Sequence, residues 1–175
     1  MEESPLQREI SFRWDKSART AAAAAKFAAR VIGASPEYIS HGEIQTGLSL
    51  DGTTWSSDLE ALYADDFAKL GDERDLLVAR DAADKIVAIA ILAWEHSSRR
   101  SFAVLEDMTV EMDYRSHGLG ARMLEHVEEA VRGHRIDWLF LESGVRNERA
   151  HAFFERQGFS TLSQVFAKRL VGTGF

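Results

Sequence analysis

The segment EMDYRSHGLGARML (111–124) contains residue types that could hold a phosphate group. Gly118 and Gly120 stand two positions apart, directly before an amphipathic run, and Arg115 precedes them. A turn between a strand and a helix exposes the first N–H groups of the helix, and the helix dipole favours an anion there. Glycines let ligand oxygens approach the backbone closely. The pattern therefore predicts a diphosphate site, although two glycines also suit a tight turn without a ligand.

Two common phosphate-binding motifs do not match this segment. A P-loop requires Gly-Lys-Ser/Thr, which the chain lacks. The dinucleotide-binding fingerprint requires a third glycine, and no residue completes it after Gly118 and Gly120. A P-loop is thereby excluded, and a Rossmann site is disfavoured.

The elements that would position this turn follow from apolar periodicity, which predicts an α/β fold. Three strands in succession and then a strand–helix–strand–helix–strand order indicate a mixed sheet with a parallel crossover. Residues 36–55 show no clear pattern. The predicted strands are 8–14, 75–81, 85–96, 101–112, 136–143 and 161–170. The predicted helices are 17–32, 57–70, 119–132 and 147–157.

Length and composition limit the classes of protein. The 175 residues suit a single domain, residues 1–175, and the absence of cysteine excludes disulfides and thiolate metal sites. The net charge of −7 argues against a general nucleic-acid-binding protein. The six histidines have no metal-ligand spacing, so no metal is expected. The acidic N-terminus lacks the apolar core of a signal peptide, and no apolar run is long enough for a membrane span, so we expect a cytoplasmic protein.

At this point two motifs resemble the GNAT superfamily of acyl-CoA-dependent N-acetyltransferases. The run RSHGLGA (115–121) matches the family's Arg/Gln-x-x-Gly-x-Gly/Ala pattern at the start of a helix. The run VRNERAHAFFERQGF (145–159) resembles the family's later helix, which begins at an asparagine and ends in Gly-Phe. The run LEDMTV (105–110), which precedes the first of these motifs, is similar to the diamine-acetyltransferase type of the family. The resemblance implies a sheet of about six to seven strands with helices on both faces.

The resemblance also implies acetyl-CoA as the co-substrate. In this family the fourth and fifth strands splay apart and the pantetheine arm fills the gap, pairing with the backbone of Met108, Thr109 and Val110. Asn147 would bond the pantetheine near its thiol, and Phe154 would pack against the arm. Subunit pairing as a homodimer is a further expectation. The residues implied to hold the pyrophosphate are Arg115, Ser116, His117, Gly118, Leu119, Gly120 and Ala121.

Acetyl transfer to the primary amine of a small molecule or peptide requires a base, because a lysine-like amine has a pKa of about 10.4. By resemblance Glu106 is the candidate base and the N–H of Met108 the donor to the oxyanion. Strand alternation places Glu106, Met108 and Val110 on one face. Alternatively, Glu106 only neutralises a buried arginine or binds the substrate cation. Glu142 is the reserve carboxylate.

Phe154 departs from the family pattern, in which many relatives carry a tyrosine that protonates the leaving thiolate. Three explanations remain open. The thiolate leaves unassisted or takes a proton from water; another hydroxyl, that of Tyr63 or Tyr38, reaches the site; or the protein binds acyl-CoA without turnover. The last alternative would make the chain a non-catalytic acyl-CoA sensor.

Overall fold

The computed structural model describes residues 9–171, which divide into two compact units. Unit 1 contains the described residues up to Pro36 together with Ser57–Glu142. Unit 2 contains Glu37–Ser56 and the described residues from Ser143 onward. Among residues 9–171, no helix combines the length and apolarity needed to cross a membrane.

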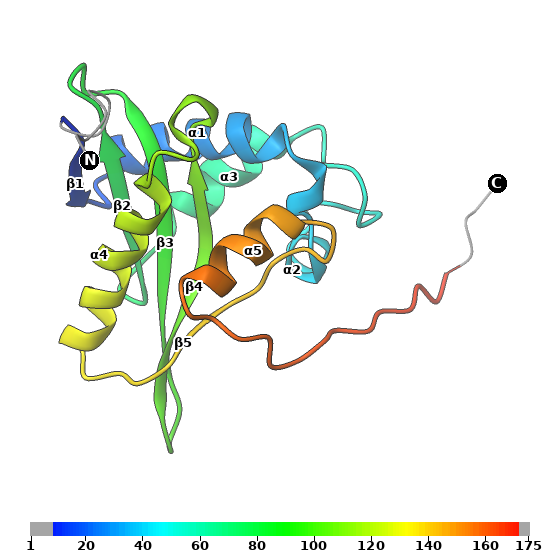
Figure 1. Ribbon diagram of the computed structural model, residues 1–175. Coiled ribbons are helices and arrows are strands. Elements are labelled where there is room, and N and C mark those ends of the chain that lie inside the picture. Colours follow the sequence, from blue (N-terminus) through cyan, green and yellow to red (C-terminus); the bar gives the residue numbers. More distant parts are fainter. Residues whose placement is uncertain (1–8, 172–175) are drawn as a thin grey trace. The chain divides into compact units, whose positions relative to one another are not determined.

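Unit 1 is built on a five-stranded mixed sheet whose strands follow the chain order (Figure 1). The first four strands are antiparallel neighbours, and the last pair is parallel. The crossover that joins this parallel pair confirms the mixed α/β fold expected from the sequence. The strands are β1 (Ser11–Trp14), β2 (Arg74–Arg80), β3 (Ile86–His96), β4 (Ser101–Val110) and β5 (Leu139–Leu141).

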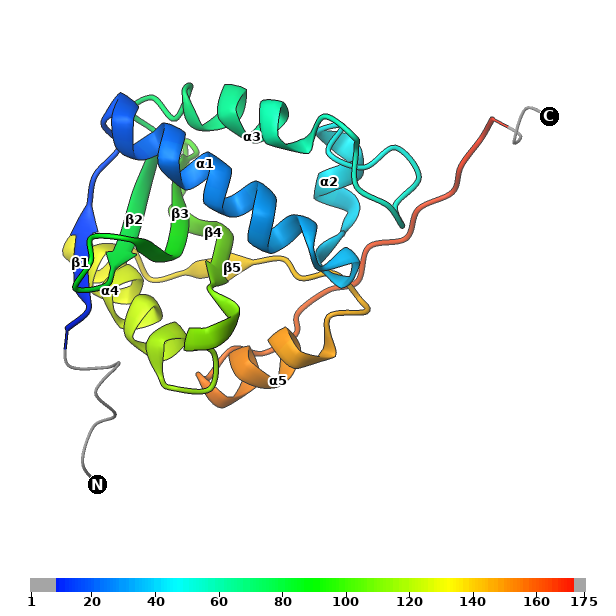
Figure 2. The same cartoon turned by 90° about the horizontal axis from the view of Figure 1, so that it is seen from above.

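Helices cover both faces of this sheet. In Figures 1 and 2, α1 (Ala18–Gly33) and α3 (Leu59–Phe67) lie on one face, and α4 (Leu119–Gly133) lies on the other. β3 is therefore buried on both faces, which explains its nearly uninterrupted apolar sequence. The short η2 (Met112–Tyr114) connects β4 to α4.

Two helices of unit 1, α1 and α4, have a clear sequence cause. In α1, small alanines on the buried face let the helix pack closely on the sheet, and Ser17 caps its first turn through the N–H of Thr20. In α4, buried side chains recur at helical spacing, each contributing about 1.5–3 kcal/mol of transfer free energy. These buried residues of α4 are Leu119, Met123, Leu124, Val127 and Val131.

Unit 2 contains two short α-helices, α2 (His41–Gln45) and α5 (Glu148–Arg156), after η1 (Pro36–Tyr38). A reciprocal capping box joins Ser40 and Glu43 at the start of α2. Gly144 lies so close to the chain before α2 that a Cβ there would be 2.6 Å from the carbonyl oxygens of Glu37 and Ile39. The absence of a side chain at Gly144 is thus part of the packing of unit 2.

Two strand predictions need correction. Residues 161–170 form no strand, and β5 has three residues where 136–143 was expected, so the sheet has five strands and not six or seven. Apolar alternation reports a preference for extended backbone, but a strand also needs a hydrogen-bonded partner, which this segment lacks among the described residues. Its apolar side chains are exposed, with Phe166 at 90%.

Candidate functional site

Glu106 lies at an irregularity in the sheet. Ala90 of β3 pairs with Met108, and Ile91 pairs with Asp107, but Leu92 pairs with Leu105. Glu106 therefore has no residue opposite it on β3, as in a β-bulge, where one extra residue locally re-aims a side chain. Burial still alternates along β4 on either side of this irregularity, because Leu105 and Thr109 are buried while Glu106 is exposed and Met108 and Val110 are partly exposed.

On the other edge of β4, the ladder with β5 ends one residue before Glu106. β5 pairs with β4 from Ala103 to Leu105, where the parallel ladder ends at Leu141. Residues 107–110 remain paired with β3, while the β5 ladder does not reach residues 106–110. An extended ligand with amide groups of its own can pair with a strand edge where a neighbouring strand ends.

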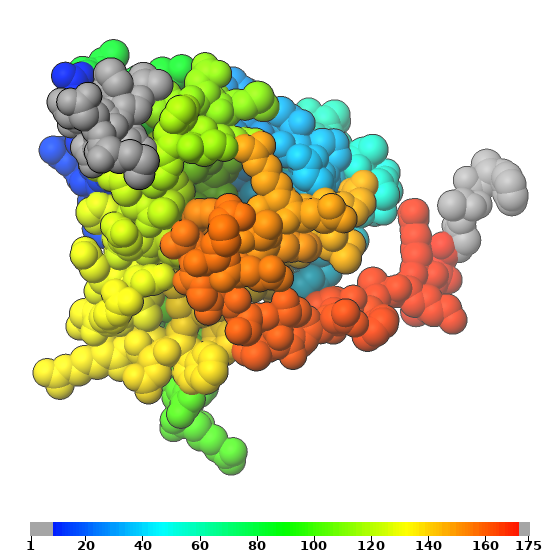
Figure 3. Space-filling model, in the orientation of Figure 1, coloured from blue at the N-terminus to red at the C-terminus, as the bar shows by residue number. Residues whose placement is uncertain are grey.

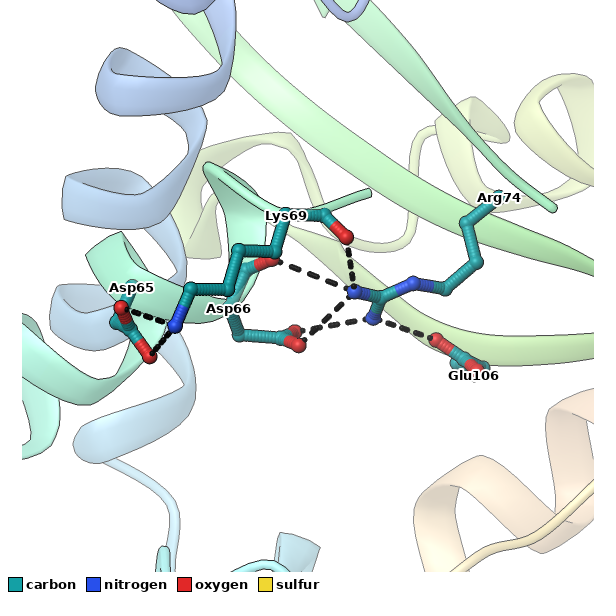
Figure 4. Close-up of polar contacts among 5 residues, drawn as sticks. All are labelled: Asp65, Asp66, Lys69, Arg74 and Glu106. Carbon is teal, nitrogen blue, oxygen red and sulfur yellow. Dashed lines mark hydrogen bonds and ion pairs between the residues drawn. The ribbon is translucent and has the colours of Figure 1, made fainter. Parts of the chain in front are cut away.

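An arginine on β2 contacts the Glu106 carboxylate (Figure 4). Nη1 of Arg74 donates to Oε2 of Glu106 at 3.3 Å. The same guanidinium holds Asp66 more closely, at 3.0 and 3.2 Å, and donates to the backbone carbonyls of Asp66 and Lys69. The Glu106 side chain keeps 35% of its surface exposed, against 19% for Arg74. Arg74 is therefore bound mainly to the C-terminal end of α3, and Glu106 receives one long hydrogen bond from it.

Burial raises the pKa of the Glu106 carboxyl above its usual value, although Arg74 opposes this shift. The negative charges of Asp66 and Glu95 raise the pKa further. A carboxyl whose pKa is raised is a better general base near neutral pH than an ordinary glutamate. The same carboxylates make the surroundings favourable for a cation. The arrangement thus combines a raised pKa, which suits a proton acceptor, with an ion pair to Arg74, which suits a counter-ion.

The pKa of Glu106 is expected to shift in opposite directions when Arg74 and Asp66 are substituted. Arg74→Met removes the charge that favours the ionised form, so the pKa of Glu106 should rise. Asp66→Asn removes a like charge, and Glu106 is then the one carboxylate within residues 9–171 that pairs with Arg74, so the pKa of Glu106 should fall. The side-chain carboxyl carbon of Glu106, followed by NMR against pH in both variants, measures the two shifts. Shifts of the same sign in both variants would contradict this electrostatic description.

The glycine-containing turn lies between β4 and α4 in unit 1. Gly118 is the N-cap of α4 with a left-handed φ of 80°, and Ser116 also has a positive φ, of 64°. Leu119 is buried and anchors the helix start, whereas residues 116–118 are exposed. Figure 3 shows this turn and α4, in yellow-green to yellow, on the visible face of unit 1. The chain therefore presents this turn to solvent on a fixed base.

The backbone donors of this turn are available for an anion. The first N–H bonded within the helix is that of Arg122, which donates to the Gly118 carbonyl at 3.1 Å. The N–H groups of Leu119, Gly120 and Ala121 form no hydrogen bond in the described part of the chain. Nε of Arg115 donates to the carbonyl of Val110 at 3.0 Å, which ties this cation to the end of β4. Donors of this kind fit a diphosphate.

The remaining sequence candidates belong to unit 2, except Tyr63 and the reserve carboxylate Glu142, which belong to unit 1. Asn147 caps α5, where its side-chain oxygen accepts from the N–H of Ala150 at 3.3 Å, while its amide nitrogen keeps two donors. Phe154 packs edge-on against Phe153 and Phe159. Tyr63 is 1% exposed within α3, a position unsuited to protonating a thiolate in an open site.

Arg74 and Asp66 are the site residues that sequence reasoning missed. Their link to Glu106 depends on the β2–β3–β4 register, which brings together positions 32 residues apart. The one available signal was the open possibility that Glu106 neutralises an arginine, and Arg74 is that arginine.

Comparison with known proteins agrees with this geometry. A model of the acetyltransferase (GNAT) family matches residues 44–159, about two thirds of the sequence. The chain belongs to this family. No curated protein sequence matches the chain significantly. The family match confirms the superfamily expected from the two motifs; it does not identify the diamine-acetyltransferase type.

Solved structures share the fold at low sequence identity. The BH1408 protein of Bacillus halodurans, as a tetramutant, has a TM-score of 0.72 at 18% identity, with 91% of this chain and 99% of that chain covered. A possible acetyltransferase from Clostridium difficile 630 has a TM-score of 0.65 at 18% identity, covering 94% and 99%. Glucosamine-6-phosphate N-acetyltransferase from Arabidopsis thaliana has a TM-score of 0.57 at 17% identity, covering 93% and 99%.

Proposed function

We propose that this protein is an acetyl-CoA-dependent N-acetyltransferase that acts on a primary amine. The observation that carries the proposal is the coincidence, on β4, of three features. Glu106 occupies a bulge, the edge from 106 to 110 is not covered by β5, and the strand leads directly into the turn with open N–H groups. Coenzyme A is a long molecule with a diphosphate, then amide groups, then a thiol. From the turn back along β4 to Glu106, the three features follow the same order, which supports the proposal.

The residues of unit 1 divide the work as follows. The turn at 115–121 binds the diphosphate through backbone donors. The edge of β4 aligns the pantetheine amides, and the N–H of Met108 donates to the carbonyl oxygen that gains negative charge. Glu106 takes a proton from the ammonium form of the acceptor, so that the nitrogen lone pair becomes available. Bound acetyl-CoA supplies the thioester carbonyl under attack.

The step is balanced without a metal or a redox partner. A C–N bond forms to the acetyl carbon, the nitrogen releases its second proton to water, the C–S bond breaks, and the sulfur leaves with the bonding electrons. Water protonates the thiolate, since a thiol with a pKa of about 8.5 is a moderate leaving group and Phe154 has no proton to give. Among residues 9–171, no group of His, Asp or Glu is suited to a metal ion.

A cationic amine, such as a diamine, is the acceptor class that the electrostatics support best. Asp66 and Glu95 act on Glu106 as neighbouring negative charges. They would attract a substrate that carries a second positive charge besides the reacting amine. A neutral or acidic amine would gain nothing from them.

An acyl-CoA sensor without catalysis is the second candidate. It is favoured by the ion pair of Glu106 with Arg74 and by phenylalanine at position 154. The deciding experiment follows free thiol release from acetyl-CoA in the presence of diamines, aminoglycosides, amino acids and peptides, with the reaction lacking amine as control. Amine-dependent, steady release supports the enzyme. Tight binding of acetyl-CoA with no release above the control across these amines would reject it in favour of the sensor.

A further inference from the structure

Unit 1 contains a shallow cavity, open to solvent, away from β4 and its turn. Its volume is about 540 Å³. It lies where α1 meets the start of α3 and the turn between β2 and β3. None of residues 106–121 lines it. Its lining residues are Ala23, Lys26, Phe27, Arg30, Glu60, Arg80, Lys85 and Ile86.

The cavity is cationic in a protein whose net charge is −7. Four of its lining side chains are Lys or Arg, and Glu60 is the one carboxylate among them. Arg80 is tied to Asp84, whose carbonyl accepts from Nη1 at 2.8 Å. Lys26 and Lys85 form no ion pair within residues 9–171, and both are exposed. Two ammonium groups can therefore meet a ligand, although the charge of Lys85 also acts on Glu111.

The floor of this cavity is apolar. Phe27 of α1 is 5% exposed and Ile86 of β3 is 7% exposed, and Ala23 adds a methyl group beside them. Inorganic phosphate would not cover this apolar surface, which would stay in contact with water. A molecule that carries an anionic group on an apolar body would cover Phe27 and Ile86 while its charge meets the lysines.

Arg30 connects this cavity to the turn that precedes α4. Its guanidinium forms two hydrogen bonds to the carboxylate of Glu111. Glu111 in turn caps η2 through the N–H of Met112 at 3.2 Å, and its own N–H donates to the carbonyl of Val87 at 2.8 Å. A ligand anion that binds Arg30 competes with Glu111, which holds the chain between β4 and the glycine turn.

We propose that this cavity is a binding site for an organic anion, with a phosphate or carboxylate group on an apolar body. The anionic group pairs with Lys26 and Lys85 and competes with Glu111 for Arg30. Because a ligand on Arg30 releases Glu111, occupancy of the cavity loosens the chain before the 115–121 turn and weakens binding of an anion there. By linkage, an anion at the turn weakens binding in the cavity to the same extent. Binding at the cavity stands on its own residues; the coupling rests in addition on the proposed function.

The test uses the full-length protein and phenyl phosphate as the probe, with benzyl alcohol as the neutral control. In amide NMR spectra, phenyl phosphate should produce saturable shifts at Lys26, Phe27 and Ile86, and benzyl alcohol should bind much more weakly. Lys26→Gln and Lys85→Gln should each weaken the affinity about fivefold or more, and added salt should weaken it too. Benzoate in place of phenyl phosphate shows which anionic group is preferred.

Lys69→Gln is the matched control, because Lys69 pairs with Asp65 on α3 and does not line the cavity. It should leave the affinity for phenyl phosphate unchanged. The proposal is overturned if the shifts do not map to the cavity, if benzyl alcohol binds equally well, or if Lys69→Gln weakens binding as much as Lys85→Gln. Coupling is measured separately, as the loss of coenzyme A affinity at saturating phenyl phosphate. Its absence together with normal binding of both ligands would reject the coupling alone.

Discussion

Gly120→Leu is expected to abolish measurable coenzyme A binding while the protein remains folded. Gly118 and Gly120 differ in what the fold requires of them. Gly118 needs its glycine for a left-handed φ of 80°, so its presence is explained by the turn alone. Gly120 lies inside α4 and has no positive φ. The backbone conformation at position 120 therefore does not require glycine, and a bound ligand that needs the space of a side chain would explain it.

The size of the effect follows from the contacts that a leucine side chain would prevent. Losing two charge-assisted hydrogen bonds to the diphosphate costs about 3–6 kcal/mol, a factor of about 100 or more in the dissociation constant. Stability should not fall, because leucine exceeds glycine in helix propensity by up to about 1 kcal/mol. Isothermal titration with coenzyme A and a thermal melt measure the two quantities on the same sample.

Gly133→Leu is the matched control. Gly133 is the last residue of the same helix, and a Cβ there would meet no atom within 4 Å. Coenzyme A affinity should be unchanged in this variant. Native affinity in Gly120→Leu would show that the diphosphate does not lie at this turn and would remove the basis of the proposed function.

The sequence predicted the elements around the site well because their signals are local. The buried face of α4 repeats at helical spacing, and β3 is apolar over nine consecutive residues, Ile86–Trp94. The turn at Gly118 could be located for the same reason, since a glycine pair before an amphipathic run is visible without any tertiary information. These parts of the fold were confirmed nearly at their predicted bounds.

What could not be predicted depends on pairing between distant segments. The bulge at Glu106 is set by how β4 aligns with β3, and no residue in LEDMTV marks it. The contact of Arg74 with Glu106 also requires the β2–β3 register. The failed strand at 161–170 has the same origin, because its composition favours an extended chain and says nothing about a partner. Register and partner choice are properties of the assembled sheet.

Glu106→Gln is expected to lower kcat/KM by about 10²–10⁴ at neutral pH, the usual contribution of a general base. Glutamine preserves the volume and still accepts a hydrogen bond from Arg74, so the bulge in β4 should persist. The substitution removes the proton acceptor and the negative charge that faces Arg74. Because an aliphatic amine has a pKa of about 10.4, each unit of pH below that value lowers the neutral fraction about tenfold. Higher pH should therefore restore part of the lost rate in the variant.

The dependence of kcat/KM on pH tests whether Glu106 is the general base. Burial raises the pKa of Glu106; below this raised pKa the carboxyl is protonated and cannot accept a proton. Native kcat/KM should therefore increase as the pH rises through that value, which lies above that of an ordinary glutamate. In Glu106→Gln, the rise of kcat/KM near the pKa of Glu106 (the acidic limb) disappears. The rise at higher pH, caused by deprotonation of the acceptor amine, remains. Glu128→Gln, on the exposed side of α4 where Glu128 pairs with Arg132, is the matched control and should keep the native profile. An acidic limb that survives in Glu106→Gln would assign the base to another group.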